Sequence, residues 1–115
     1  MFRFEELEIW KTACDVGSDL CDIANQLEEK RLYRFAEQLR GAAISISNNI
    51  AEGSGSSSNP EFRSFLNYAR RSVFECASMV AFFCRKGYLD TYIRDKHHAE
   101  LDALSRRITT FSRSL

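Results

Sequence analysis

Four arginines in the central part of the chain are candidates for phosphate contacts: Arg40, Arg63, Arg70 and Arg71. Arg63 and Arg70 are seven residues apart, so they share one face of a helix, and Arg71 lies beside them. Guanidinium groups bind phosphate oxygens, and an exposed Tyr68 or Phe82 would offer a ring for base stacking. The same arginines can equally pair with acidic side chains of a neighbouring copy. The residue types leave both interpretations open.

A second polar group occupies the end of one helical segment and consists of Asn48, Asn49 and Glu52. Asn48 and Glu52 are four residues apart and share a helix face, whereas Asn49 points about 100° away. Such a group can form a hydrogen-bonding or carboxylate site at the end of a bundle. It can also tie the helix end to the serine-rich segment that follows. We interpret it as structural, because catalysis needs a second titratable group within reach and none is evident nearby.

The remaining chemistry-bearing residues indicate no catalytic or metal site. The four cysteines, at positions 14, 21, 76 and 84, include no pair two to four residues apart, as a zinc site normally requires, and we expect them in the core. His97 and His98 are adjacent, so their side chains diverge by about 100°, and a packed or interface role is expected. The segment GSGSSSN lacks the GK[ST] ending of a phosphate-binding loop. The sequence therefore predicts no enzyme, no cofactor and no metal.

Four amphipathic segments must position these residues. Apolar residues recur at steps of three and four, which is typical of helices that bury one face, and strand-like alternation is missing. Asn59 is the expected N-cap of the third helix, with Pro60 at its first position, and Gly53 is the expected residue just past the end of the second. The pattern predicts one all-α domain over residues 1–115, an antiparallel up-down-up-down four-helix bundle. Its helices are expected at residues 6–28, 32–52, 60–86 and 91–113.

Two of the expected helices carry a second line of apolar residues, beside the line of apolar residues that is expected to face the core. Residues 9, 16 and 23 form it on the first helix, and residues 74, 77 and 81 form it on the third. A second line requires contact with more than one neighbour. It predicts either deep burial within one chain or an interface between copies. Phe82 lies off both lines, and its exposure would suggest a partner.

The net charge of the chain does not favour binding to nucleic acid, because 16 basic and 16 acidic residues cancel. Residues 1–28 nevertheless hold two basic and seven acidic residues, and the rest of the chain carries the balancing positive charge. This asymmetry favours attraction between copies or a basic face for an acidic partner. No apolar run approaches the roughly 18 residues of a membrane span, and the acidic N-terminus is unlike a signal peptide. We therefore expect a cytoplasmic protein without a membrane partner.

Three stretches resemble a known family: LEIWKTA, QLRGAAISISNNIAEGSG and FRSFLNYARRSVFE. They are similar to the bacterial four-helix-bundle proteins encoded in intervening sequences of 23S ribosomal RNA genes. The resemblance covers residues 4–89 and implies a cytosolic bundle that assembles into a ring, commonly a homopentamer, without an established enzymatic activity. A distant relative, the accessory protein of diversity-generating retroelements, binds nucleic acid, and this favours nucleic acid here by analogy only.

The chain departs from the family pattern at several positions. Gly41 stands where a second basic residue often follows Arg40, and Ser47 stands where proline is frequent. Residues 56–58 are serines at a tip that often carries arginine. The differences at Gly41 and at the tip weaken the basic surface that the family would present, whereas the difference at Ser47 concerns the local helix geometry.

Two function hypotheses follow from the residues and the resemblance. The first is a non-enzymatic homo-oligomer that binds RNA, DNA or a ribonucleoprotein through the four arginines. The alternative is a protein-interaction scaffold that binds no nucleic acid. Co-purification of nucleic acid or of a protein distinguishes the two.

Overall fold

The computed structural model describes residues 1–115 and consists of helices without any strand. A short 3₁₀ turn, η1, at Arg3–Glu6 precedes four α-helices. Their bounds are Glu8–Glu29 for α1, Tyr33–Ser54 for α2, Asn59–Arg85 for α3 and Thr91–Arg113 for α4. The all-α prediction is confirmed, and every helix end lies within two residues of the position that the apolar pattern predicts.

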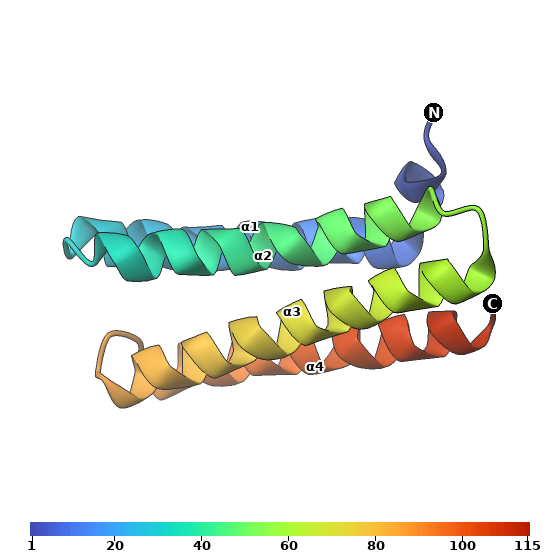
Figure 1. Cartoon of the computed structure of the whole chain (residues 1–115). Coiled ribbons are helices and arrows are strands. Elements are labelled where there is room, and N and C mark those ends of the chain that lie inside the picture. The colour runs from blue at the N-terminus through green and yellow to red at the C-terminus, as the bar shows by residue number, and fades with distance from the viewer.

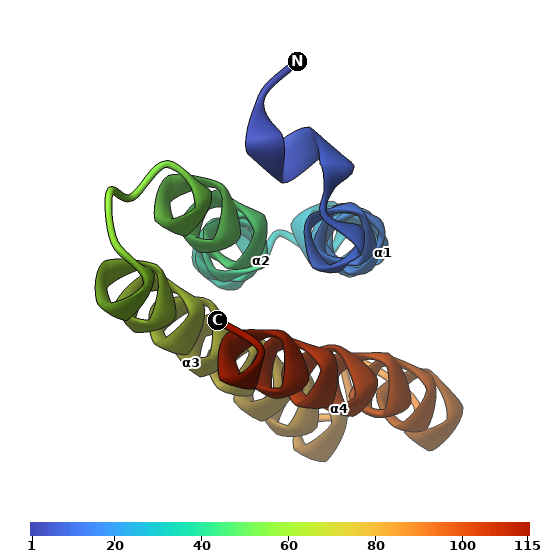
Figure 2. The same ribbon diagram turned by 90° about the vertical axis from the view of Figure 1, so that its right-hand side faces the viewer.

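The four helices form two side-by-side pairs. Figure 1 shows α1 beside α2 and α3 beside α4, with both within-pair links at one end of the molecule and the α2–α3 link at the other. Both termini lie at the α2–α3 end. Figure 2 looks along α1 and α2, and there α3 and α4 slant across the view. The molecule measures 44 × 22 × 20 Å, so each helix runs along its length.

The starts of α3 and α4 are capped by side chains, and the cap of α3 is a different residue from the one expected. The Ser58 hydroxyl, and not Asn59, accepts the backbone N–H of Glu61 at 3.3 Å and caps α3. Ser58 has the extended conformation of an N-cap, which places Pro60 in the first turn, where its missing N–H costs nothing. Asp90 caps α4 by accepting the N–H of Ile93 at 2.8 Å.

Gly53 does not terminate α2, contrary to the sequence-based expectation. The helix continues through Ser54, and Gly53 is buried against α3. A Cβ atom on Gly53 would lie 2.7 Å from Phe65 Cβ and 2.8 Å from Phe62 Cδ1. The physical role of this glycine is therefore close approach between α2 and α3, because only a residue without a side chain fits there.

A single cluster of 24 buried apolar residues, contributed by all four helices and by Leu89 in the α3–α4 link, forms the core. The second apolar line of α1, at Ile9, Val16 and Ile23, is at most 5% exposed, so burial within one chain accounts for it. The second line of α3 differs, because Phe74 is 59% exposed. Of these two lines, only the one on α3 therefore leaves an apolar side chain exposed to a partner.

The cysteines and histidines are less uniformly placed than predicted. Cys76 is buried, and this burial raises the pKa of its thiol to about 12. The other three cysteines are only half-buried, so the core prediction is wrong for them. His97 is buried in the core, whereas His98 is half-buried and its Nε2 lies 2.9 Å from the carbonyl oxygen of Ala77.

Candidate nucleic-acid interface

Arg40 lies between α1 and α2, away from α3. Its guanidinium donates hydrogen bonds to Glu37 at 2.7 Å, to Asn25 at 2.7 Å and to both carboxylate oxygens of Glu28 at 3.3 Å. The hydrogen bonds with Glu28, followed by those with Glu37, raise the pKa of the Arg40 guanidinium. The structure thus pairs this arginine within the chain and separates it from the other three.

Arg63 and Arg70 line a groove between α3 and α4, about 230 Å³ in volume, which we call the α3–α4 groove. Arg113, at the end of α4, faces the same groove. No acidic side chain lines it, and none of the three arginines pairs with an acidic side chain. Arg63 Nη1 donates a hydrogen bond to the main-chain oxygen of Leu115, at 3.2 Å. The groove therefore concentrates three guanidinium groups without an acidic side chain.

Neutral polar groups complete the α3–α4 groove. Asn67, Thr109 and Ser112 line it together with the arginines. The Thr109 hydroxyl donates to the carbonyl oxygen of Ser105 at 3.1 Å, so it cannot donate to a ligand at the same time. The C-terminal end of α4 contributes a partial negative charge of about half an elementary charge, which three guanidinium groups outweigh. The site can bind an anion with several oxygens.

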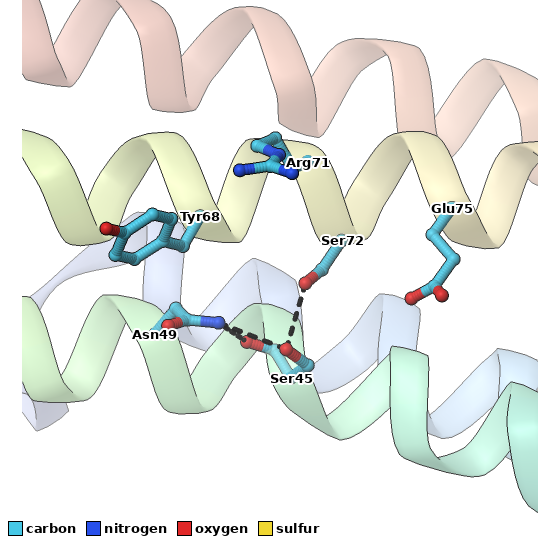
Figure 3. A pocket seen from close by; sticks show the side chains of 6 residues that line it. All are labelled: Ser45, Asn49, Tyr68, Arg71, Ser72 and Glu75. Atoms are coloured by element: carbon cyan, nitrogen blue, oxygen red, sulfur yellow. Dashed lines mark hydrogen bonds between the residues drawn. The ribbon is translucent and has the colours of Figure 1, made fainter.

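Arg71 lies on the other flank of α3, at a groove between α2 and α3 of about 470 Å³. Figure 3 shows this α2–α3 groove, with Ser45 and Asn49 on α2 opposite Tyr68, Arg71, Ser72 and Glu75 on α3. Its floor is held by hydrogen bonds. The hydroxyls of Ser45 and Ser72 lie 2.9 Å apart, and Asn49 Nδ2 donates to the backbone oxygen of Ser45 at 2.8 Å and to its hydroxyl at 3.0 Å.

Three side chains of the α2–α3 groove have no hydrogen-bond partner within the chain. They are Tyr68, Arg71 and Glu75. Arg71 and Glu75 are four residues apart, yet they form no ion pair, and Figure 3 shows Glu75 reaching toward α2 while the Arg71 guanidinium lies on the Tyr68 side. The Tyr68 ring is 47% exposed and rests edge-on against Phe65, with ring centroids 5.8 Å apart. A donor, an acceptor and an aromatic ring thus face solvent together.

A third hollow, of about 350 Å³, lies on the outer face of α3 between Arg70, Arg71 and Phe74. The Arg70 guanidinium lies over the Phe74 ring, 5.3 Å from its centroid. Phe82, the other ring expected to serve in stacking, is 48% exposed but packs against Phe35 and Phe83 at centroid distances of 5.8 and 6.1 Å. Phe74 is therefore the more accessible ring beside the arginines.

The family described as 23S rRNA-intervening sequence protein matches residues 5–110, almost the entire chain. The chain belongs to this family. The resemblance seen in the sequence is confirmed, and the match extends beyond residue 89 into α4. No curated protein matches the chain.

The polar group at the end of α2 is not joined into one cluster. Asn49 bonds to Ser45, whereas Asn48 and Glu52 are exposed and their side chains make no hydrogen bond. The polar link between α2 and α3 is instead the pair Ser45–Ser72.

Other features of this family member bear on what the site can hold. No three or more histidine, cysteine or acidic side chains lie together in a way that could hold a metal ion. No helix is both long enough and apolar enough to span a membrane. Sequence reasoning missed Arg113, whose position 50 residues after Arg63 offered no local signal.

Proposed function

We propose that this antiparallel up-down-up-down bundle is a non-catalytic, homo-oligomeric protein that binds nucleic acid through the α3–α4 groove. One observation carries the proposal: Arg63, Arg70 and Arg113 face one groove that no acidic side chain lines. Arg40, Arg94 and Arg106 pair with carboxylates of the chain, whereas the three arginines of this groove lie together without an acidic side chain among them. Three guanidinium groups in one groove, without an acidic side chain between them, match the oxygens of successive phosphates.

The expected contribution of the groove to the binding free energy follows from the usual strength of an exposed ion pair. An exposed ion pair contributes about 0.5–1 kcal/mol, so three contribute about 1.5–3 kcal/mol, or a factor of roughly 10 to 150 in affinity. Three phosphate contacts also predict that the logarithm of affinity falls with the logarithm of salt concentration, with a slope of about −2 to −3.

The test measures fluorescence anisotropy of labelled RNA and DNA at two salt concentrations. We expect the triple variant R63Q/R70Q/R113Q to lose at least tenfold in affinity and most of the salt dependence. The matched control R34Q/R85Q/K86Q removes the same charge at the opposite end of the molecule, from exposed residues, and should lose less than threefold. Absence of binding by the wild type at low salt, or equal losses in both variants, would refute the proposal.

Exposed apolar residues on the outer face of α2 support self-association. Tyr33 is 58% exposed and Ile44 is 57% exposed, and neither lines the α3–α4 groove. We expect an assembly, a homopentamer as the resemblance implies, with a mass by light scattering of five times the 13.2 kDa of the chain. A monomer at micromolar concentration would contradict this part of the proposal.

The same apolar surface favours a second function, a scaffold that binds proteins without nucleic acid. The two functions separate in the purified material. A high ratio of absorbance at 260 to 280 nm that falls after nuclease treatment supports nucleic-acid binding, whereas a co-purifying protein with a low ratio supports the scaffold.

A further inference from the structure

Cationic and aromatic side chains alternate across α3, from the α4 side to the α2 side. The α3–α4 groove and the outer hollow share Arg70, and the outer hollow and the α2–α3 groove share Arg71. The three hollows therefore form one continuous band. Along it lie Arg70, Phe74, Arg71 and Tyr68, so each arginine is next to an exposed ring.

We infer that the nucleic acid bound at this surface is single-stranded and crosses α3 along this band, with one base on Phe74 and another in the α2–α3 groove on Tyr68. The inference rests on the proposed function and adds the class of nucleic acid. Phosphates would lie at the arginines, and the bases between them would lie on the two rings. This alternation is the pattern of proteins that bind single strands through stacking and backbone charge.

The spacing of the two rings argues against a duplex. Tyr68 and Phe74 are six residues apart in α3, which corresponds to about 9 Å along the axis and about 120° around it. With a helix diameter of about 10–12 Å, the two rings are roughly 13 Å apart. Bases stacked in a duplex follow one another at about 3.4 Å along each strand and hide their faces. Only a strand whose bases are splayed apart can place one base on each ring.

The α2–α3 groove is suited to hold one base rather than a second phosphate. Its volume of about 470 Å³ has room for a base. The Glu75 carboxylate repels phosphate and accepts hydrogen bonds from amino or imino groups of a base. Asn49 has the same preference, because its Nδ2 is already bonded to Ser45 and its Oδ1 remains an acceptor. The phosphate of the same nucleotide is therefore expected at Arg71.

The test compares three fluorescein-labelled probes by anisotropy at low salt: a ten-nucleotide single-stranded RNA, its DNA equivalent and a 20-base-pair RNA duplex. The wild type should bind a single-stranded probe at least tenfold more tightly than the duplex. Tyr68→Ala and Phe74→Ala should each weaken single-strand binding at least fivefold and leave duplex binding unchanged, since stacking on an aromatic ring contributes that much per base. Tyr68→Phe and Phe74→Tyr should retain affinity.

Tyr92→Ala is the matched control, because Tyr92 is 75% exposed on α4 and lines none of the three hollows. It should bind like the wild type. Equal affinity for duplex and single strand, or no effect of either alanine variant while R63Q/R70Q/R113Q weakens binding, would overturn the inference and leave the proposed function intact. Absence of binding to every probe would refute both. A lower solution mass for Phe74→Ala would place this ring between copies and would also overturn the inference.

Discussion

The close contact at Gly53 gives a sharp test of the packing between α2 and α3. In Gly53→Ala the new Cβ would lie 2.7 Å from Phe65 Cβ, 2.8 Å from Phe62 Cδ1 and 3.2 Å from Phe62 Cε1. Phe65 Cβ is attached directly to the backbone, and Phe62 is only 1% exposed, so rotamer changes cannot relieve the overlap. Moving the two helices apart costs about 3 kcal/mol, the upper part of the usual range for overpacking. Alanine recovers about 1 kcal/mol through its helix propensity, leaving a net loss of about 2 kcal/mol.

Gly41→Ala is the matched control within the same helix. Nothing lies within 4 Å of a Cβ atom at this position, so only the propensity gain remains. We expect Gly41→Ala to stabilise the fold by about 0.5–1 kcal/mol and Gly53→Ala to lower the melting temperature by about 8 °C. Urea and thermal unfolding followed by circular dichroism, at one fixed protein concentration, measure both. If Gly53→Ala proved as stable as the wild type, the reasoning from close approach would be wrong.

Two further predictions concern Cys76 and Arg40. Burial raises the pKa of Cys76 from 9.0 to about 12, so above pH 9 the unfolded chain loses this proton and the folded chain keeps it. Stability should therefore fall as the pH rises. Between pH 8.5 and 10.5, urea unfolding should show that the free energy of unfolding falls by about 2 kcal/mol more in the wild type than in Cys76→Ala. If the free energies of the two proteins fell in parallel with pH, this prediction would be contradicted. Arg40→Ala removes the contacts with Glu28 and Asn25 and should lower the melting temperature by less than Gly53→Ala does, while nucleic-acid affinity stays within twofold of the wild type. A tenfold loss of affinity would show that Arg40 contacts the ligand despite its position.

The apolar periodicity of the sequence was sufficient to predict the positions of the helices and most of the core residues. Burial of one face is a local property of an amphipathic helix, so residues such as Leu39, Leu66 and Leu101 could be assigned to the core from spacing alone. The family resemblance likewise depends on short stretches of sequence, and the match over residues 5–110 confirms it.

The helix ends and the contact between α2 and α3 could be predicted only in part from the sequence. The Asn59-Pro60 pair marked the start of α3 to within one residue, but the hydroxyl that caps it belongs to Ser58. Gly53 looked like the end of a helix because glycine often occupies that position. Its actual role depends on how close the side chains of Phe62 and Phe65 come, and a linear sequence does not contain that distance.

The arrangement of the candidate site depended on tertiary structure more than the helices and the core did. By itself the sequence determined which residues carry charge and which rings lie at helical spacing from them, and so it singled out Arg63, Arg70 and Arg71. Which flank of α2 or α3 faces which neighbour is decided by the packing of all four helices. That packing turned Arg40 toward Glu28 on α1 and brought Arg113 into the groove of Arg63 and Arg70, because contacts between helices join residues that are far apart in the chain.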